Sequence, residues 1–466
     1  INPRKTYDDF KKQALQKYND FRTQANEQYA VFLKQAWEQY NALPAIPKPK
    51  DETVPPVTSP EEDKDKPIES NPIPIKDVVV PPAPDPQPTP IAPIKEDSQP
   101  QERTIDFIYC GTKCRIRLNK NLNLTLQDCS NEQLSNVWTQ LSAEGVLNNT
   151  IRDCLAIRVG RNLCDWAYLN LLSSFSKAMY GNSNEATMLT SYIYAQSGYK
   201  MRLGRNEQHI YLLYASEHGI YDISYFNIDG LKFYPFECDK NKLEICDASF
   251  PKEKPLSLYI SQNQKFEYNA SDVRTLTSRR YPDVQVLVQV NKNLIEFYNT
   301  YPSSEVNANF MTRWAMYANT PLDAKVKEEL YPALKEKING LSQLEAANKL
   351  LNWVQTAFVY EYDDKVWGHD RAFFAEETLY YPYCDCEDRS ILFSRLIRDL
   401  LGLKTILVFY PGHLASAVCF TDNVSGDYIS LNGKHYVLTD PTYIGAPVGM
   451  TMPDMDNTQA HVILLE

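Results

Sequence analysis

Residues 383–390 read Tyr-Cys-Asp-Cys-Glu-Asp-Arg-Ser and run directly into an apolar segment that ends at Gly402. Leucines recur every four residues in that segment, so the sequence predicts a helix over residues 387–401. Cys386 then lies at the first turn, where the helix dipole and free backbone N–H groups favour a thiolate over a thiol. We therefore predict a reactive cysteine at position 386.

Two further polar residues fall at the ends of predicted strands. His413 comes at the start of one strand, and Asp440 directly follows another. A thiolate nucleophile needs an imidazole to share its proton, and the imidazole needs a carboxylate to fix its orientation. The order Cys386, His413, Asp440 therefore predicts a catalytic triad. Its supporting elements are helices at 346–360 and 387–401 and strands at 404–409, 414–420 and 434–439, an α+β domain over residues 291–466.

These segments resemble the transglutaminase-like superfamily, whose members have a papain-like cysteine-enzyme fold. The resemblance is strongest to bacterial extracytoplasmic members with a DCED motif, such as those of Bacteroidetes. It spans residues 345–445 and rests on the DCED motif at 385–388, the Gly-His pair at 412–413 and the Asp-Pro-Thr motif at 440–442. It implies that Cys386 is the nucleophile, His413 the base and Asp440 the orienting acid.

One residue departs from the family pattern. Cys384 stands where a small residue is usual before the Asp-Cys pair. It is a packing residue, a resolving thiol, a disulfide partner or, from a less favourable position before the helix, the nucleophile itself. A Cys-x-Cys pair could also be half of a zinc site, but no further pair of Cys or His residues completes one at suitable spacing. We expect neither a metal nor an organic cofactor.

The expected activity is that of a cysteine-dependent amide hydrolase or acyl transferase acting on a protein or peptide. The aromatic residues before the nucleophile either line its cleft or pack in the core: Trp367, Tyr380, Tyr381 and Tyr383. The alternative is a non-catalytic binding or assembly protein of the cell envelope that uses the same fold as an interaction surface.

The middle region, residues 103–290, is predicted to be a second α+β domain. Asn182 lies sixteen residues before Gly198 and His209 eleven after it, the same spacings that Cys386 and His413 keep around Gly402. The match indicates either a divergent copy of the C-terminal domain or chance similarity. In a divergent copy Asn182 replaces the nucleophile, Asp222 stands for the acid, and acyl transfer is lost. Predicted elements are strands within 104–118, helices at 131–144, 166–180 and 184–197, and strands at 200–203 and 210–214.

Residues 1–43 are predicted to form one amphipathic helix with an eleven-residue repeat. Phe10, Phe21 and Phe32 keep this spacing, and tyrosines and alanines follow it too. Eleven residues make about three turns, so the stripe runs almost straight along the helix. Such a stripe needs cover, from the globular domains, from a second copy or from a partner protein.

Residues 44–102 are predicted to be a semi-stiff spacer. They hold seventeen of the 30 prolines and no glycine or aromatic residue, a composition that favours polyproline II and cannot build a core. Spacers of this kind are typical of extracytoplasmic proteins. Because the chain starts at Ile1 rather than Met, we expect any signal peptide or lipid anchor to lie upstream.

The composition excludes several classes of protein. A net charge of −11 without a basic cluster argues against nucleic acid, and no apolar run is long enough for a transmembrane helix. Ten cysteines in 466 residues fit neither a disulfide-dense scaffold nor a zinc array. Cys110/Cys114 and Cys238/Cys246 are therefore either disulfides or buried thiols.

Overall fold

The computed structural model describes residues 3–50, 53–60, 68–83, 101–143 and 145–466, with the backbone alone at 3–6. The chain forms two compact units. Unit 1 comprises Ile1–Pro47, Pro84–Leu258 and Gln264–Glu267, and unit 2 comprises Lys48–Ala83, Tyr259–Asn263 and Tyr268–Glu466. Each unit is therefore built from separate stretches of chain, not from the continuous domains 103–290 and 291–466 that the sequence predicts.

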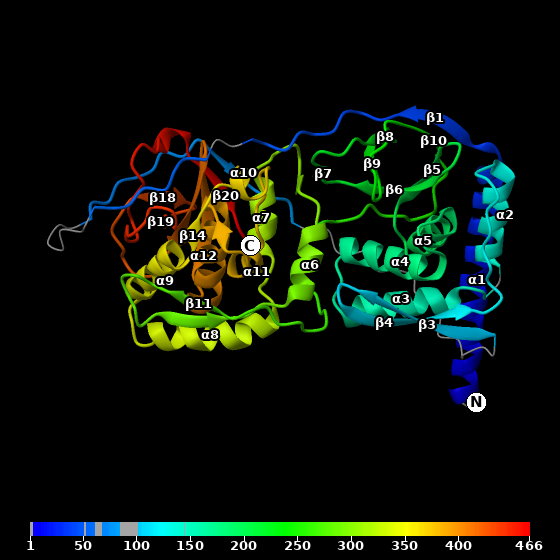
Figure 1. The fold of residues 1–466 in the computed structure, drawn as a ribbon, viewed down its shortest axis with the longest axis horizontal. Helices are drawn as coiled ribbons and strands as arrows, with labels where there is room; N and C mark the ends of the chain where they lie inside the picture. The colour runs from blue at the N-terminus through cyan, green and yellow to red at the C-terminus, as the bar shows by residue number, and fades with distance from the viewer. Residues whose placement is uncertain (1–2, 51–52, 61–67, 84–100, 144) are drawn as a thin grey trace. The chain divides into compact units, whose positions relative to one another are not determined.

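Unit 1 contains helices, one six-stranded sheet and a hairpin (Figure 1). The helices are α1 (Pro3–Gln35), α2 (Asn131–Ser142), α3 (Asn148–Gly160), α4 (Asp165–Tyr180) and α5 (Asn184–Gln196). The sheet has the order β1 (Trp37–Asn41), β10 (Lys242–Cys246), β5 (Met201–Arg205), β6 (Ile210–Ser216), β9 (Leu231–Pro235), β8 (Phe226–Ile228). The other strands are β3 (Glu102–Tyr109) and β4 (Thr112–Asn119), which form the hairpin, and β7 (Gly219–Ile220).

Unit 2 also has a six-stranded sheet, and the long helix α12 (Cys386–Leu401) packs on it (Figure 1). The sheet has the order β18 (Tyr428–Leu431), β19 (Lys434–Thr439), β17 (His413–Cys419), β16 (Lys404–Tyr410), β20 (His461–Leu464), β2 (Asp77–Val79). The other helices are α6 (Lys292–Thr300), α7 (Thr312–Asn319), α8 (Ala324–Ile338), α9 (Gln343–Ala357), α10 (Asp363–Val366), α11 (Ala375–Tyr380) and the 3-10 helix η1 (Asn457–Gln459). The short strands are β11 (Arg274–Thr277), β12 (Gln285–Val288), β13 (Ser304–Glu305), β14 (Val359–Tyr360) and β15 (Tyr383–Cys384).

The two large sheets share one topology. Strands β5, β6, β8, β9 and β10 follow α5 in the same spatial order that β16, β17, β18, β19 and β20 adopt after α12. Each sheet also receives an edge strand from the N-terminal part of the chain, β1 antiparallel to β10 and β2 parallel to β20. A duplicated domain would produce this shared order.

The N-terminal helix is shorter than its repeat predicts, because α1 ends at Gln35 and residues 37–41 form β1. Trp37 and its neighbours pair in register with β10, which gives their backbone groups sheet partners in place of helical ones. The guanidinium of Arg205 lies over the Trp37 ring, 4.1 Å from its centroid, and holds the strand in place. The prediction of a helix through residue 43 is therefore wrong for its last turns.

The predicted spacer is also wrong where the structure describes it. Within unit 2, Ile73 and Val79 are 5% and 6% exposed, and β2 completes the sheet beside β20. Within unit 1, Ile46 forms a bridge to Tyr221. Apolar residues between the prolines thus find cover on the units, an outcome that the composition alone does not predict.

The shorter predicted elements mostly agree with the structure. Ser130 caps α2 by accepting a hydrogen bond from the backbone N–H of Gln133. Helix α3 (Asn148–Gly160) was not predicted. None of the ten cysteines is disulfide-bonded, so the structure contains neither of the two disulfides considered above. None of the described helices is both long and apolar enough to cross a membrane.

Candidate active site

Cys386 is the first residue of α12, as the sequence predicts. Asp385 precedes the helix, and its backbone N–H donates to Oδ2 of Asp388 over 3.1 Å. The other oxygen of Asp388 accepts from the backbone N–H of Phe373 over 2.8 Å. Asp388 is fully buried, so these two bonds fix the start of the helix and the direction of the Cys386 side chain.

His413 and Asp440 lie together on neighbouring strands. His413 Nε2 is 2.8 Å from Asp440 Oδ2, and the two residues are 1% and 2% exposed. Oδ1 of Asp440 accepts from the backbone N–H groups of Thr442 and Tyr443 over 2.8 and 3.1 Å, which holds the carboxylate still. With Nε2 bonded to the carboxylate, His413 Nδ1 is buried and has no hydrogen-bond partner among the described residues. In this tautomer Nδ1 is a free acceptor for a proton.

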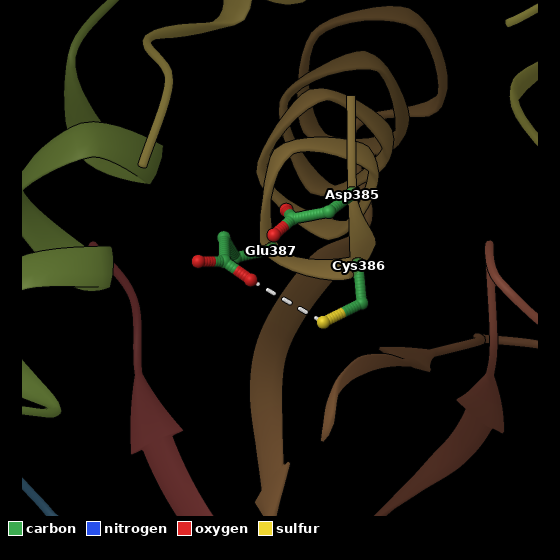
Figure 2. Close-up of side chains that lie close together, drawn as sticks. All are labelled: Asp385, Cys386 and Glu387. Atoms are coloured by element: carbon green, nitrogen blue, oxygen red, sulfur yellow. Dashed lines mark hydrogen bonds between the residues drawn. The ribbon is translucent and has the colours of Figure 1, made fainter. Parts of the chain in front are cut away.

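Cys386 lies next to this pair but does not bond to it. The Ser390 hydroxyl donates to the Leu414 carbonyl over 2.8 Å, which ties α12 to the start of β17. A backbone hydrogen bond from Leu414, the residue after His413, reaches the Cys386 thiol and lowers its pKa, although other influences on that pKa are larger. The thiol itself donates to Glu387 Oε2 over 3.3 Å (Figure 2), and no hydrogen bond joins Cys386 to His413 in the described structure.

The expected lowering of the thiol pKa is contradicted. Burial raises the pKa of Cys386 well above its usual value, and the carboxylates of Glu387 and Asp385 raise it further. Figure 2 shows both carboxyl groups near the start of α12, with Glu387 facing the sulfur atom. Burial and two like charges outweigh the dipole of the helix, so the thiol is protonated near neutral pH in this conformation.

Replacing Glu387 with glutamine should lower the pKa of Cys386, because it removes the nearest negative charge while keeping the side-chain size. Alkylation of Cys386 by iodoacetamide, followed by peptide mass spectrometry across a pH series, measures this pKa. Each pKa unit of downward shift speeds labelling at pH 8 by about tenfold. Asp364→Asn is the control, since Asp364 is exposed and lies outside this cluster. An unchanged titration in Glu387→Gln would show that Glu387 does not set the thiol pKa.

A group of carboxylates, three buried and two half-buried, surrounds the start of α12. Oxygen atoms of Asp363, Asp385 and Asp388 lie within 4.8 Å of one another, and so do oxygens of Asp363, Asp370 and Glu387. Burial raises the pKa of Asp363 to about 8, and the negative charge of Glu387 contributes. These acids are the described residues best placed to hold a divalent cation, since hard cations take oxygen ligands. Within the chain, two effects reduce the repulsion among these carboxylates: Arg313 forms an ion pair with Asp370, and carboxyl groups with a raised pKa take up protons.

Gln355 and Arg389 hold the loop that carries Asp440, and no pattern in the sequence signals either role. Gln355 is 2% exposed, and its Oε1 accepts from the backbone N–H of Gly445 over 3.0 Å. Arg389 donates to the carbonyls of Gln355, Phe358 and Pro441. The side-chain amide of Gln355 donates to three carbonyls, those of Asp440 (2.9 Å), Tyr443 (2.8 Å) and Ala446 (3.0 Å).

The aromatic residues that precede Cys386 in the sequence differ in their surroundings. The Tyr360 hydroxyl is buried without a hydrogen-bond partner among the described residues, and after burial itself the charge of Cys386 is the main influence that raises its pKa. It is therefore an available donor close to the sulfur. Trp367 and Tyr381 instead pack edge to face with ring centroids 4.9 Å apart, and Tyr383 is 42% exposed. Trp367 and Tyr381 have the packing role that the sequence left open.

Residues 54–59, here called the covering segment, lie across the loops that carry the candidate triad. The backbone N–H of Val54 donates to the Gly412 carbonyl over 2.9 Å, next to His413. Further along, Ser59 and Val57 exchange backbone hydrogen bonds of 2.8 Å with Ile444, four residues after Asp440. Cys386 is only 3% exposed, so a substrate needs a local opening to reach it.

Unit 1 has a corresponding position without a thiol. Asn184 is the first residue of α5, and its Oδ1 accepts from the backbone N–H of Ile210, the residue after His209. This repeats the contact between Cys386 and Leu414, so Asn184 corresponds to the nucleophile, and the prediction of Asn182 is off by two residues. Asp222 is also a wrong match, because it precedes β8 whereas Asp440 follows β19. A cavity of about 750 Å³ opens here, lined among others by Lys177, Asn184, His209 and Glu237.

Comparison with known proteins yields no relative. No family model, no curated protein and no solved structure matches this chain. The resemblance to the transglutaminase-like superfamily therefore stays a prediction, and the function is inferred from the residues of the site.

Proposed function

We propose that unit 2 is a cysteine-dependent acyl-transfer domain that attacks an amide through Cys386, His413 and Asp440. The observation that carries this proposal is the state of His413. Its Nε2 is bonded to Asp440 at 2.8 Å, and its Nδ1 is buried with no partner among the described residues. Burying an imidazole nitrogen without a hydrogen-bond partner destabilises the fold. Such a nitrogen is useful if it acts as the general base and accepts a proton during the reaction.

The proposed reaction begins with a proton transfer, since the thiol is protonated at rest. The Cys386 thiol turns from Glu387 toward His413, and Nδ1 takes its proton while the sulfur attacks the amide carbonyl. The imidazolium that forms is stabilised by Asp440. Collapse of the tetrahedral intermediate breaks the C–N bond, returns the proton to the leaving amine and leaves a thioester on Cys386.

The second half of the reaction releases the acyl group. Water or an amine gives a proton to His413 Nδ1 and attacks the thioester. The C–S bond then breaks, Nδ1 returns the proton to the departing sulfur, and the product is an acid or a new amide. In both halves negative charge develops on the carbonyl oxygen. In this proposal the backbone N–H of Cys386 stabilises that charge, together with the hydroxyl of Tyr360, which is buried without a described partner and interacts electrostatically with Cys386.

A protein or peptide is the substrate class that this site favours. The covering segment already holds an extended backbone against the loop after β19 by paired hydrogen bonds with Ile444. An extended substrate that displaces it could use the same backbone groups. The expectation that this chemistry takes place in the cell envelope is part of the proposal and rests on the family resemblance alone.

An active ester tests whether Cys386 forms an acyl-enzyme. With p-nitrophenyl acetate, the wild-type chain should release a burst of about one equivalent of p-nitrophenolate, and the acetyl group should be found on the Cys386 peptide. Cys386→Ala should lose the burst, and Cys384→Ala should keep it, since Cys384 is equally buried but faces the Val359 carbonyl. Acetylation spread over other cysteines, with none at Cys386, would refute the proposal.

A binding role is the second candidate function. The cavity in unit 1 is at the position that corresponds to the candidate triad of unit 2. Asn184 replaces the cysteine there and cannot form a thioester. A chain in which neither unit turns over substrate would be an envelope binding or assembly protein. If the chain is folded but forms no acyl-enzyme with the active ester, the result favours this binding role.

A further inference from the structure

The N-terminal helix buries only one of its aromatic rows. Tyr29 is 1% exposed and packs on Trp138 with ring centroids 4.5 Å apart. Phe10, Phe21 and Phe32, which follow the same eleven-residue repeat, are 70%, 49% and 42% exposed. The helix therefore presents a row of phenylalanines that nothing in the described chain covers.

The face around this row, here called the phenylalanine stripe, is almost without charge. Lys17 is its one charged residue in the described helix, and a lysine stem can lie across apolar surface. An uncharged, aromatic face on an exposed helix marks a contact with another protein. The exposed uncharged residues that accompany the phenylalanines are Gln13, Gln24, Gln28, Val31 and Gln35.

The spacing of the stripe makes it complementary to itself. Eleven residues advance about 16 Å along a helix, so Phe10 and Phe32 lie at equal distances on either side of Phe21. A two-fold axis at Phe21 therefore places Phe10 of one copy on Phe32 of the other. A surface that matches itself under a two-fold axis is what an isologous dimer requires.

Charges on and beside the stripe favour the antiparallel arrangement. Lys17 and Glu27 are exposed, and neither forms an ion pair within the described structure. With Phe21 on the axis, Lys17 lies within about 3 Å of the level of Glu27 in the second copy, on the same flank of the pair. Asp9 and Lys34 match in level only, to about 1.5 Å, because both point away from the second helix. Asp20 lies within about 3 Å of the level of its own copy on this flank, one like-charge contact against the Lys17–Glu27 pair, which forms twice.

A parallel arrangement loses this match. It would place Lys17 beside Lys17 of the second copy, at the contact itself, and like charges at an interface cost affinity. Glu27 would then lie beside the flank of the second helix that carries Tyr29, and that flank is buried against the rest of unit 1. Charge complementarity therefore selects a second copy in the antiparallel direction as the cover of the stripe.

We propose that α1 pairs with α1 of a second copy of this chain, antiparallel, with Phe21 at the two-fold axis. The pairing covers the phenylalanine stripe, and by symmetry it forms the ion pair between Lys17 and Glu27 twice. It is independent of the chemistry at Cys386, because it uses only the exposed face of α1.

Sedimentation velocity of the full chain tests the pairing. Wild type should sediment as a dimer at micromolar concentration, and Phe21→Glu should be a monomer with unchanged circular dichroism, since its side chain is half exposed. Glu27→Lys should weaken the dimer, and the double variant Lys17→Glu with Glu27→Lys should restore it. A monomeric wild type, or a double variant no tighter than Glu27→Lys, would overturn the proposal.

Disulfide trapping tests the direction of the two helices. Phe21→Cys should cross-link to its own copy quickly on oxidation, because the two residues meet at the axis. Phe10→Cys should not, since the two copies of residue 10 would lie about 33 Å apart. A mixture of Phe10→Cys and Phe32→Cys chains should cross-link. Equally fast cross-linking of Phe10→Cys alone would indicate a parallel pair and contradict the proposal.

Discussion

Replacing His413 with alanine should slow the acylation of Cys386 by about 10²–10⁴-fold, the usual contribution of a positioned general base. The thiol is buried, and its pKa is raised by burial, Glu387 and Asp385, so it cannot ionise on its own near neutral pH. His413 Nδ1 is a buried acceptor without a described partner, and the next residue, Leu414, bonds to the thiol through its backbone. Stopped-flow measurement of p-nitrophenolate release at pH 8 gives the rate.

Two further variants show whether the loss reflects the triad. Asp440→Asn should also be slow, because the amide can donate to His413 Nε2 and thereby leave the proton on Nδ1, where it blocks transfer from the thiol. His435→Ala should react like wild type, because His435 is exposed and stacks on Tyr428 away from the site. Equal rates for His413→Ala and wild type would remove His413 from the mechanism.

Replacing Gln355 with leucine should lower the free energy of unfolding of unit 2 by about 4 kcal/mol. The substitution keeps the side-chain volume but leaves three buried carbonyls and the N–H of Gly445 without this partner, and each such group costs about 1–3 kcal/mol. Some of the cost is recovered when the loop shifts, so the sum of the single terms is an upper bound. Urea denaturation followed by tryptophan fluorescence measures the change.

The same variant separates a positioning role from a purely structural one. If Gln355 holds Asp440 in place, acylation of Cys386 should slow even where Gln355→Leu is fully folded. Gln343→Leu on the same helix is the control, because its bonds to Thr421 are at the surface and should cost less than about 1 kcal/mol. A fully folded Gln355→Leu that acylates at the wild-type rate would limit Gln355 to stability.

The sequence predicted the elements of the site well because they depend on local patterns. The apolar period after Cys386 and the strands around His413 and Asp440 are readable along the chain, and His413 and Asp440 meet as expected. The pKa of Cys386 was predicted in the wrong direction. Its environment depends on burial and on Glu387, and neither the depth of a residue nor the rotamer of a neighbour follows from spacing.

Contacts between distant segments were beyond prediction. Gln355 shares a face of α9 with two other amides, Asn348 and Asn352, and nothing in this spacing points to a loop 85 to 91 residues away. The Pro-rich region lacks glycine and aromatic residues, yet its valines and isoleucines pack on the units. The repeat in α1 predicted a longer helix because the pairing of β1 with β10 is a tertiary contact.

The pairing of β2 with β20 has a consequence for the order in which the chain folds. Asp77 bonds to His461, 384 positions later, so the sheet of unit 2 cannot close until the ribosome has synthesised residues 461–464. The sheet of unit 1 needs synthesis only as far as residue 246, where Trp37 meets Cys246. Unit 1 can therefore fold during translation, whereas unit 2 waits with an unpaired β2. Contacts between segments so far apart in sequence form slowly, and strand edges stay exposed meanwhile, so we expect unit 2 to be the part of the chain that needs chaperones most.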